Sequence, residues 1–310
     1  MQSQGPVGAV RAMACAAPEA LQSLPSFFLI GPPRTGTSWL HEVLSRHTLL
    51  PSSTKETRFF DVHFHRGLKW YRAHYPKRFG HRMMGEVAPT YFASPKARER
   101  IVQMVPTARM VCIFRHPIDR VVSLYRVKRA YGMIPWGFEE ALVRDRELME
   151  SSRYASHLKT WQNAVGKDRV LATVYDDLRQ NPQIFVDSVA DFIGVPRFKL
   201  APSEIHRVHG SENMTHPRSY YRTRGATFMS NWCKARRLDR VVTAIKRSPL
   251  IKLFLGGGPP FAQIAPETTL KLYELFRPEI EELEVLLNRD FSAWKGDPVC
   301  AASRPEQKVS

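Results

Sequence analysis

The chain has 310 residues, of which 43% are hydrophobic and 11% aromatic. This supplies enough apolar surface for a large globular core and excludes a fibrous or wholly disordered protein. Its 46 Lys and Arg residues outnumber 29 Asp and Glu residues, so the formal net charge is +17 and the sequence pI about 10.0. Such a surface attracts anions such as nucleotides, acidic polysaccharides, nucleic acid or lipid headgroups, although it also serves general solubility.

Cysteine spacing and apolar runs bear on the cellular compartment. The longest apolar runs, residues 27–30 and 110–114, are far shorter than the ~20 residues that span a bilayer. Residues 1–25 lack the continuous apolar core of a secretory signal and are predicted to be a disordered tail, as are residues 297–310. A cytoplasmic protein with one folded domain, residues 26–296, is therefore expected. The cysteines form no CxxC pair, zinc-like spacing or disulfide framework: Cys15, Cys112, Cys233 and Cys300.

Three times along the chain, a short apolar run is followed by a turn and an amphipathic helical pattern. The predicted strand and helix pairs are residues 26–31 with 37–47, 108–114 with 118–130, and 169–175 with 183–194. Apolar strands that alternate with helices indicate a parallel sheet, with ligands bound at the carboxyl ends of its strands. The expected fold class is α/β: a P-loop-like parallel sheet flanked by helices on both faces.

Two further segments complete the expected organisation. Residues 58–82 are rich in aromatic and basic side chains, which indicates irregular structure with short helices that shapes an acceptor cleft. After the glycine and proline break at 256–260, residues 266–288 have a long helical pattern. We expect this C-terminal helical segment to be interrupted at Pro278.

The sequence GPPRTGTSWL, residues 31–40, stands where the first strand turns into a helix. Backbone N–H groups at such a turn bind a phosphate, Gly36 permits close approach, and Thr37 and Ser38 add hydroxyl donors. The spacing equals that of a Walker A loop, but Thr37 replaces its Lys. The cation is Arg34, which can clamp a bridging oxygen from another angle, so a triphosphate is disfavoured.

A second candidate anion site follows the second predicted strand, in the sequence RHPIDRVVS. Arg115 stands at the strand's carboxyl end, and Ser123 follows eight residues later in the next helix. Both side chains can converge on one phosphate. Taken alone the pattern is weak, because neighbouring arginines can be solvated and Ser123 can be a neutral helix residue.

Together, these two motifs resemble the family of sulfotransferases that use 3'-phosphoadenosine 5'-phosphosulfate (PAPS). Other segments are similar to those of heparan-sulfate type sulfotransferases and their bacterial relatives, so the resemblance covers about residues 27–294. It implies transfer of a sulfuryl group from PAPS to a hydroxyl, or else an amino group, of an acceptor, with a carbohydrate favoured. The sequences that carry it are PPRTGTSWL at 32–40, FRHPIDRVVSLYR at 114–126, KETRFFD at 55–61, GLKWY at 67–71 and GEVAPTYF at 85–92.

The resemblance also implies roles for individual residues. Arg115 and Ser123 would hold the 3'-phosphate, and Arg218 would belong to a loop that closes over the nucleotide. Many relatives have Lys in place of Arg34, and the carbohydrate enzymes usually read Glu-Lys-x-Pro where this chain has EVAP at 86–89, which leaves the acceptor open. The residues implied to hold the 5'-phosphosulfate are Arg34, Thr35, Gly36, Thr37, Ser38 and Trp39.

Sulfuryl transfer is an in-line displacement in which charge builds on the leaving phosphate oxygen. Arg34 is the candidate that stabilises this charge, because Arg remains protonated at any working pH. The acceptor must lose a proton as it attacks, and Glu56 is the favoured base, supported by the resemblance. Lys55 beside it would bind sulfate or anionic acceptor groups, although a Lys-Glu pair is also common as a surface ion pair.

Other titratable residues leave alternatives open. Glu86, at the end of a short strand, is a candidate catalytic residue that orients the acceptor, or else an ion-pair partner of Arg82. His63 and His65 offer an alternative base, or else they line one face of an extended segment. No clustered carboxylates are apparent that would hold a metal, and none is expected to be needed.

Two competing functions follow from the same features. The phosphate loop also suits a nucleotide kinase that turns over ATP with magnesium, against which the missing Walker Lys counts. The charge also suits a polyanion-binding protein without catalysis, whose binding weakens steeply with salt. Residues 218–247 contain nine Lys or Arg and one acid, so we expect contact with an anionic acceptor or a membrane surface there, without specific nucleic-acid binding.

Overall fold

The computed structural model describes residues 24–76, 82–205, 215–235 and 258–295. The chain divides into two compact units, Met1–Phe114 with Lys159–His209, and Arg115–Leu158 with Gly210–Ser310. Residues 1–23 and 297–310 of the two predicted tails, the break at 256–257 and the basic residues at 236–247 lie outside the described residues. Within the described ranges, no helix combines the length and apolar character needed to cross a bilayer.

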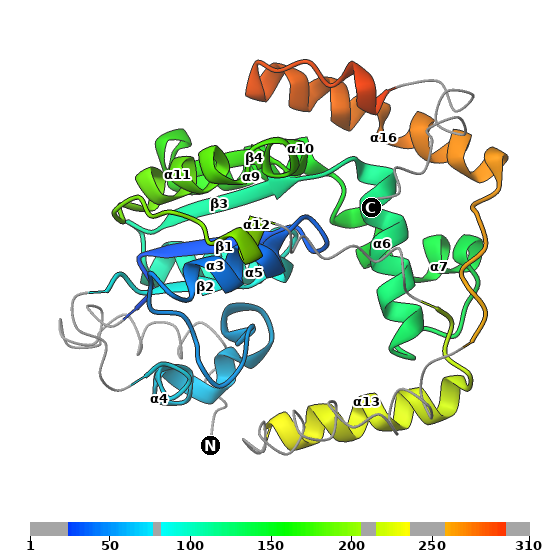
Figure 1. The fold of residues 1–310 in the computed structure, drawn as a ribbon, viewed down its shortest axis with the longest axis horizontal. Coiled ribbons are helices and arrows are strands. Elements are labelled where there is room, and N and C mark those ends of the chain that lie inside the picture. The colour runs from blue at the N-terminus through cyan, green and yellow to red at the C-terminus, as the bar shows by residue number, and fades with distance from the viewer. Residues whose placement is uncertain (1–23, 77–81, 206–214, 236–257, 296–310) are drawn as a thin grey trace, which may run out of the picture. The chain divides into compact units, whose positions relative to one another are not determined.

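A parallel four-stranded sheet forms the centre of the first unit (Figure 1). The strand order is β2 (Gly85–Val87), β1 (Phe27–Gly31), β3 (Arg109–Phe114) and β4 (Val170–Val174). Phe28 of β1 pairs with Glu86 on one side and Met110 on the other. Nearly every residue of β1, β2 and β3 is buried, as expected of parallel strands covered on both faces. The predicted α/β fold is confirmed.

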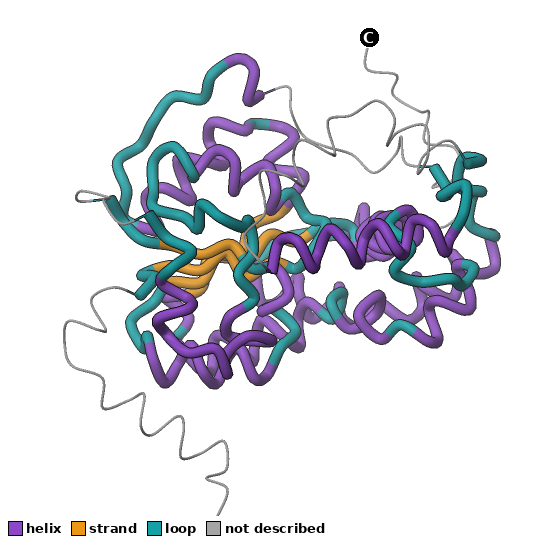
Figure 2. The backbone as a smooth tube through the Cα atoms, turned by 90° about the horizontal axis from the view of Figure 1, so that it is seen from below, coloured by secondary structure: helices purple, strands orange, loops and turns teal. Residues whose placement is uncertain are grey.

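Helices cover both faces of this sheet (Figure 2). On one face, Phe27 and Leu29 of β1 pack in a core with α3 (Thr37–Leu44) and α11 (Pro182–Ile193). On the opposite face, the ring of Phe28 lies 5.5 Å from that of Phe60. Because side chains alternate along a strand, β1 contributes to two cores.

Short helical turns occupy the segment between β1 and β2, as predicted. His63 and His65 lie in these turns, so the expectation of an extended segment was wrong. The main-chain N–H groups of Val62 and His63 both donate to the carbonyl of Arg58, which closes the first turn. The elements are η1 (Phe59–His63), η2 (Phe64–Arg66) and α4 (Gly67–Arg72).

The remaining elements of the first unit connect or flank the strands. The helix after the phosphate loop ends at Leu44, three residues earlier than the predicted His47, and turns follow it. These other elements are η3 (Pro89–Tyr91), α5 (Pro95–Met104), η4 (Lys167–Arg169), α10 (Tyr175–Gln180) and α12 (Pro202–Ile205).

The described part of the second unit is helical. Its longest helix, α16 (Pro266–Leu287), continues through Pro278, so the predicted interruption was wrong. A proline inside a helix costs about 3 kcal/mol. Here, buried residues on both sides of it, from Leu272 to Leu283, share one face that packs in the unit, where α16 contacts α6. The other elements are α6 (Pro117–Ala130), α7 (Phe138–Arg144), α8 (Arg146–Glu150), α13 (Tyr220–Ala235), η5 (Ser292–Trp294) and α9 (Tyr154–Val165), which continues into the first unit.

Candidate active site

The predicted phosphate loop joins β1 to α3. Gly36 is the N-cap of α3 at φ 95°, where a side chain is strained, and a Cβ atom there would lie 2.9 Å from Leu178. Gly36 as the N-cap offers no side-chain acceptor, so within the described residues the first N–H groups of this helix suit an anion. The hydroxyl of Thr35 is buried and donates to the carbonyl of Pro32 at 2.8 Å, which fixes the loop.

Two other residues of the loop face different surroundings. Trp39 is buried, and its indole N–H donates to the carbonyl of Glu204 at 2.7 Å, so its side chain anchors α3 in the core. The part of Trp39 in nucleotide binding stays a prediction. Arg34 is partly buried and adopts φ 73°, an uncommon conformation for a residue with a side chain.

Lys55 joins the phosphate loop to the candidate base. Its Nζ atom donates to Ser38 Oγ at 2.7 Å and lies 3.4 Å from Glu56 Oε1. The side chains of Lys55 and Glu56 are 35% and 31% exposed, so both are accessible from solvent. The structure therefore brings together two motifs that stand 17 residues apart in the chain.

His41 lies one turn after Ser38 on α3, and the sequence analysis missed it. Burial, and then the charge of Lys55, lowers the pKa of His41 to about 4. Its Nε2 atom is buried without a hydrogen-bond partner in the described part of the chain. The imidazole is therefore neutral at ordinary pH. Only its spacing of three residues from Ser38 hinted at this position.

Glu86 is completely buried, and hydroxyl groups surround its carboxylate. Tyr71 donates to Oε2 at 2.6 Å, Tyr91 donates to Oε1 at 3.0 Å, and Thr57 also donates to Oε1. Burial raises the pKa of Glu86 to about 7, while these hydrogen bonds act in the opposite direction. Arg82 is exposed and is not among the partners of this carboxylate in the described residues.

The hydroxyls around Glu86 also hold main-chain groups. Thr57 Oγ1 accepts from the N–H of Phe59 at 3.1 Å, and the Tyr91 hydroxyl accepts from the N–H of Phe60 at 3.0 Å. Strand β2 is thereby tied to the segment that begins with Lys55 and Glu56. We call residues 55–61 the base segment.

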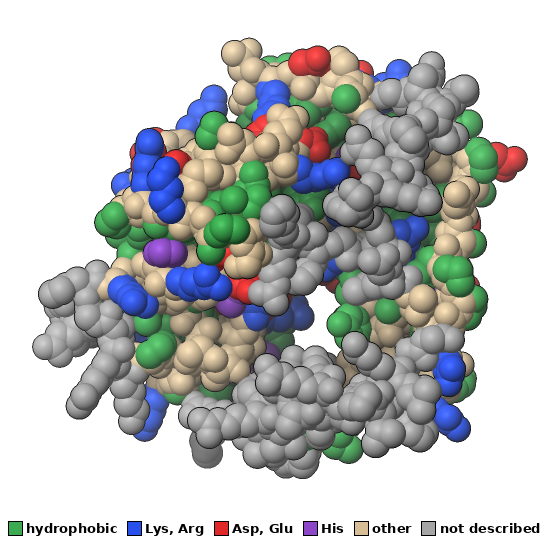
Figure 3. All heavy atoms as spheres, viewed as in Figure 1, with side chains coloured by type: hydrophobic (Ala, Val, Ile, Leu, Met, Phe, Trp, Pro, Cys, Tyr) green, Lys and Arg blue, Asp and Glu red, His purple; other side chains and the backbone are tan. Residues whose placement is uncertain are grey.

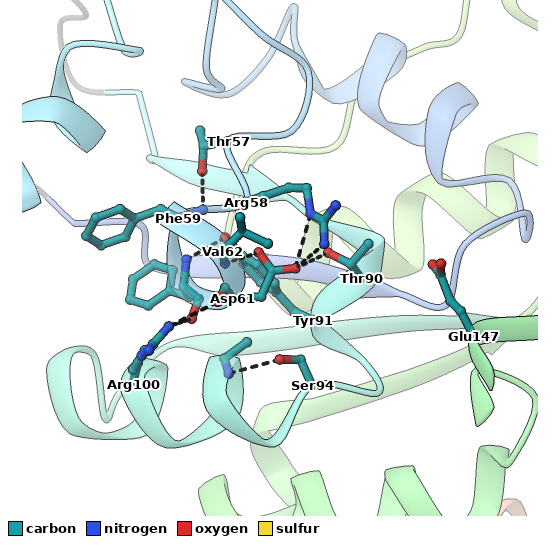
Figure 4. A network of polar contacts seen from close by, with 12 residues as sticks. Thr57, Arg58, Phe59, Asp61, Val62, Thr90, Tyr91, Ser94, Arg100 and Glu147 are labelled. Carbon is teal, nitrogen blue, oxygen red and sulfur yellow. Dashed lines mark hydrogen bonds and ion pairs between the residues drawn. The ribbon is translucent and has the colours of Figure 1, made fainter. Parts of the chain in front are cut away.

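Asp61 fixes the other end of the base segment (Figure 4). Its Oδ2 atom accepts from Thr90 Oγ1 at 2.8 Å and pairs with Arg58 Nη2 at 3.0 Å. Arg100 Nη1 donates to the carbonyl of Phe60 at 2.6 Å. The segment is therefore held from β2, from the turn after it and from α5.

The predicted 3'-phosphate residues belong to the second unit. Arg115 directly follows the last residue of β3, is partly buried, and its carbonyl accepts from the Tyr154 hydroxyl at 2.8 Å. Ser123 lies inside α6 and is 2% exposed, and Arg218 is exposed just before α13. Their part in nucleotide binding stays a prediction.

Several Lys, Arg and His side chains lie close together on the left of the face drawn in Figure 3, although charged side chains also lie elsewhere on it. Across the four described ranges, no three His, Cys, Asp or Glu side chains cluster in a way that would hold a metal ion. The expectation that no metal is needed stays a prediction.

Residues 24–219 match the family model of the sulfotransferase domain. The chain is 27% identical over 198 residues to human bifunctional heparan sulfate N-deacetylase/N-sulfotransferase 2. This match covers 56% of this chain and 22% of the human protein. It is 29% identical over 188 residues to mouse heparan sulfate glucosamine 3-O-sulfotransferase 3A1. This match covers 58% of this chain and 48% of the mouse protein. The chain thus spans about a fifth to a half of the length of these relatives.

Among solved structures, a sulfotransferase from Alicyclobacillus acidocaldarius is similar with a TM-score of 0.62 and 19% identity, covering 88% of this chain and 99% of that one. At this identity, the likeness establishes the fold alone.

Proposed function

Because the chain belongs to the sulfotransferase family, we propose that it transfers the sulfuryl group of PAPS to a hydroxyl, or else an amino group, of a carbohydrate acceptor. The observation that carries the proposal is the contact of Lys55 with both Ser38 and Glu56. It joins a loop suited to the anionic donor with a carboxylate suited to take the proton of the acceptor. A transferase needs these two functions side by side.

The phosphate loop fits the 5'-phosphosulfate of PAPS. Its uncapped helix N-terminus offers N–H donors, and Gly36 leaves space that a side chain would take. PAPS supplies an activated sulfuryl group whose leaving group is a phosphate oxygen. Arg34 stabilises the negative charge that builds on this oxygen, while Thr37 and Ser38 orient the group by hydrogen bonds. In the same proposal, Arg115 and Ser123 hold the 3'-phosphate, with Arg218 covering the nucleotide.

Glu56 acts as the general base. Its carboxylate accepts the proton from the attacking group, so that a neutral hydroxyl or amine does not have to carry positive charge as it attacks. Lys55 contacts the Glu56 carboxylate and, through Ser38, adds positive charge next to the sulfuryl group at the same time. This dual contact couples the place where the proton is removed to the place where the sulfuryl group is held.

A carbohydrate acceptor is supported by the names of the relatives, which act on heparan sulfate, and by aromatic side chains next to the base segment. The guanidinium of Arg66 lies 5.1 Å from the ring centre of Trp70, and Lys69 nearby is exposed. Such cations and rings suit a saccharide that carries negative charge.

The test is to incubate the protein with sulfur-labelled PAPS and separate panels of glycans, lipids and phenols. We expect label in the glycan panel, and label only in phenols or lipids would overturn the carbohydrate assignment.

Melting temperatures with adenosine 3',5'-bisphosphate, with magnesium ATP and with heparin give a second measurement. Stabilisation by the bisphosphate is expected. Stabilisation by ATP, with ADP formed and the phosphoryl group transferred to an acceptor, would indicate a kinase. Salt-sensitive stabilisation by heparin alone would indicate a polyanion-binding protein.

A further inference from the structure

Glu86 determines in which direction the hydroxyls of Thr57 and Tyr91 donate their protons. Each hydroxyl accepts from a main-chain N–H and has one proton of its own to donate, and that proton points to Glu86 Oε1. Their lone pairs are then turned to the main-chain N–H groups of Phe59 and Phe60. The buried carboxylate thus sets the hydrogen bonds of two consecutive residues that are themselves remote from solvent.

The conformation held in this way is an uncommon one. Arg58, between Thr57 and Phe59, has φ 51°, in the left-handed region that residues with a side chain seldom adopt. Such a residue costs on the order of 1 kcal/mol and persists when its surroundings fix it. The hydrogen bond from the Phe59 N–H to Thr57 Oγ1 spans Arg58, and the Arg58 guanidinium itself donates to Asp61 Oδ2. The first of these bonds depends on Glu86, to which Thr57 Oγ1 donates.

Glu56 is the residue that this conformation places. Its carboxylate is 31% exposed and contacts Lys55, whose side chain is itself 35% exposed. Two partly exposed side chains define a position loosely, because each retains rotamer freedom. The main chain of Glu56 is held from both sides: its carbonyl accepts from Thr54 Oγ1 at 3.2 Å, and the buried part of the segment begins next to it at Thr57.

We propose that Glu86 is a positioning residue that acts through Thr57 to hold Glu56 in line with the sulfuryl group bound by the phosphate loop. This inference rests on the proposed role of Glu56 as the base. In this role Glu86 does not orient the acceptor by direct contact. Its buried carboxylate contacts neither the donor nor the acceptor and acts on Glu56 only through Thr57.

The test compares Thr57→Val with Thr57→Ser. Valine preserves the shape but removes the hydroxyl, and we expect kcat to fall about tenfold with KM for PAPS unchanged, as a small misplacement of a catalytic group lowers rate more than binding. Serine retains the hydroxyl and should restore kcat to within about twofold. A Thr57→Val protein with normal kcat would overturn the proposal.

Tyr75→Phe is the matched control for loss of a buried hydroxyl. Tyr75 bonds to the carbonyl of Gly85 at 3.1 Å and to the hydroxyl of Tyr71, and not to Glu86. We expect a lower melting temperature but kcat within about twofold of the wild type. An equal fall of kcat in Tyr75→Phe and Thr57→Val would mean that stability alone is responsible, which would also overturn the proposal.

A double-mutant cycle isolates the path through Glu56. In a Glu56→Gln background, Thr57→Val should produce no further loss of the residual rate, because the group that Thr57 positions is gone. Full additivity of the two effects would contradict the proposal.

Amide hydrogen exchange gives a result that needs no activity. In Thr57→Val, the amide of Phe59 should exchange faster than in the wild type, whereas Tyr75→Phe should leave it unchanged. If the wild type transfers no sulfuryl group to any acceptor, the proposed function fails, and the exchange of Phe59 still decides whether Thr57 holds the segment. If the amide of Phe59 exchanges at the wild-type rate in Thr57→Val, then Thr57 does not hold the base segment, and the proposal is overturned whatever the activity of the protein.

Discussion

Glu56 and Glu86 belong to adjoining parts of the first unit, yet their carboxylates have different surroundings. Glu56 is partly exposed and lies beside a lysine that also reaches the phosphate loop. Glu86 is buried among three hydroxyls and no cation in the described residues. The comparison teaches that the same side chain can serve as a proton acceptor at the surface and as a structural centre inside.

The largest expected effect is at Glu56. Glu56→Gln removes the proposed base with little change of shape, so kcat should fall roughly 100- to 10,000-fold. The melting-temperature shift with adenosine 3',5'-bisphosphate should remain as in the wild type, since the donor site is intact. Glu99→Gln, at an exposed position on α5, is the control. Normal turnover in Glu56→Gln would remove this residue from the base role.

A loss of about 100-fold in kcat is expected for Arg34→Met, because a charge that stabilises the leaving oxygen would be missing. Arg34→Lys retains a cation and should lose less. Steady-state kinetics with PAPS as the varied substrate measure both variants. Equal rates of Arg34→Met and Arg34→Lys would show that the charge of this residue is irrelevant to the transition state.

Glu86 should appear in the pH dependence of stability. Its pKa rises from 4.5 to about 7 on folding, so between these values the folded protein binds a proton that the unfolded chain has released. The stability that the protonated group contributes is complete below about pH 4.5 and is lost as the pH rises through about 7. Relative to Glu86→Gln, wild-type unfolding free energy should fall by about 3 kcal/mol over this range. Denaturant titrations that show a constant difference would refute the buried titration.

The smallest effect is expected at Lys55. Lys55→Met breaks the link between Ser38 and Glu56 but leaves both groups present, so kcat should fall about tenfold. Lys96→Met, at an exposed position on α5, controls for the loss of one positive charge. If the two variants have the same kcat, Lys55 contributes only to the overall positive charge of the protein and not to the active site.

The sequence alone predicted the fold class, because apolar runs that alternate with helical patterns permit few arrangements other than a covered parallel sheet. It also predicted the phosphate loop, since the glycine and hydroxyl spacing is local and its structure depends on neighbours in the chain. The same local reasoning was wrong at Pro278, where packing on both sides of the proline outweighs its cost.

Tertiary structure decided which of these residues meet. The hydrogen bond from Lys55 to Ser38 and the hydroxyls around Glu86 join residues 17, 29, 15 and 5 positions apart. No periodicity encodes such contacts, because they arise only when the base segment packs with α3, α4, β2 and η3. The sequence therefore determined which chemical groups are present, and folding determined that one glutamate is accessible while the other is buried, since burial depends on the whole surrounding core.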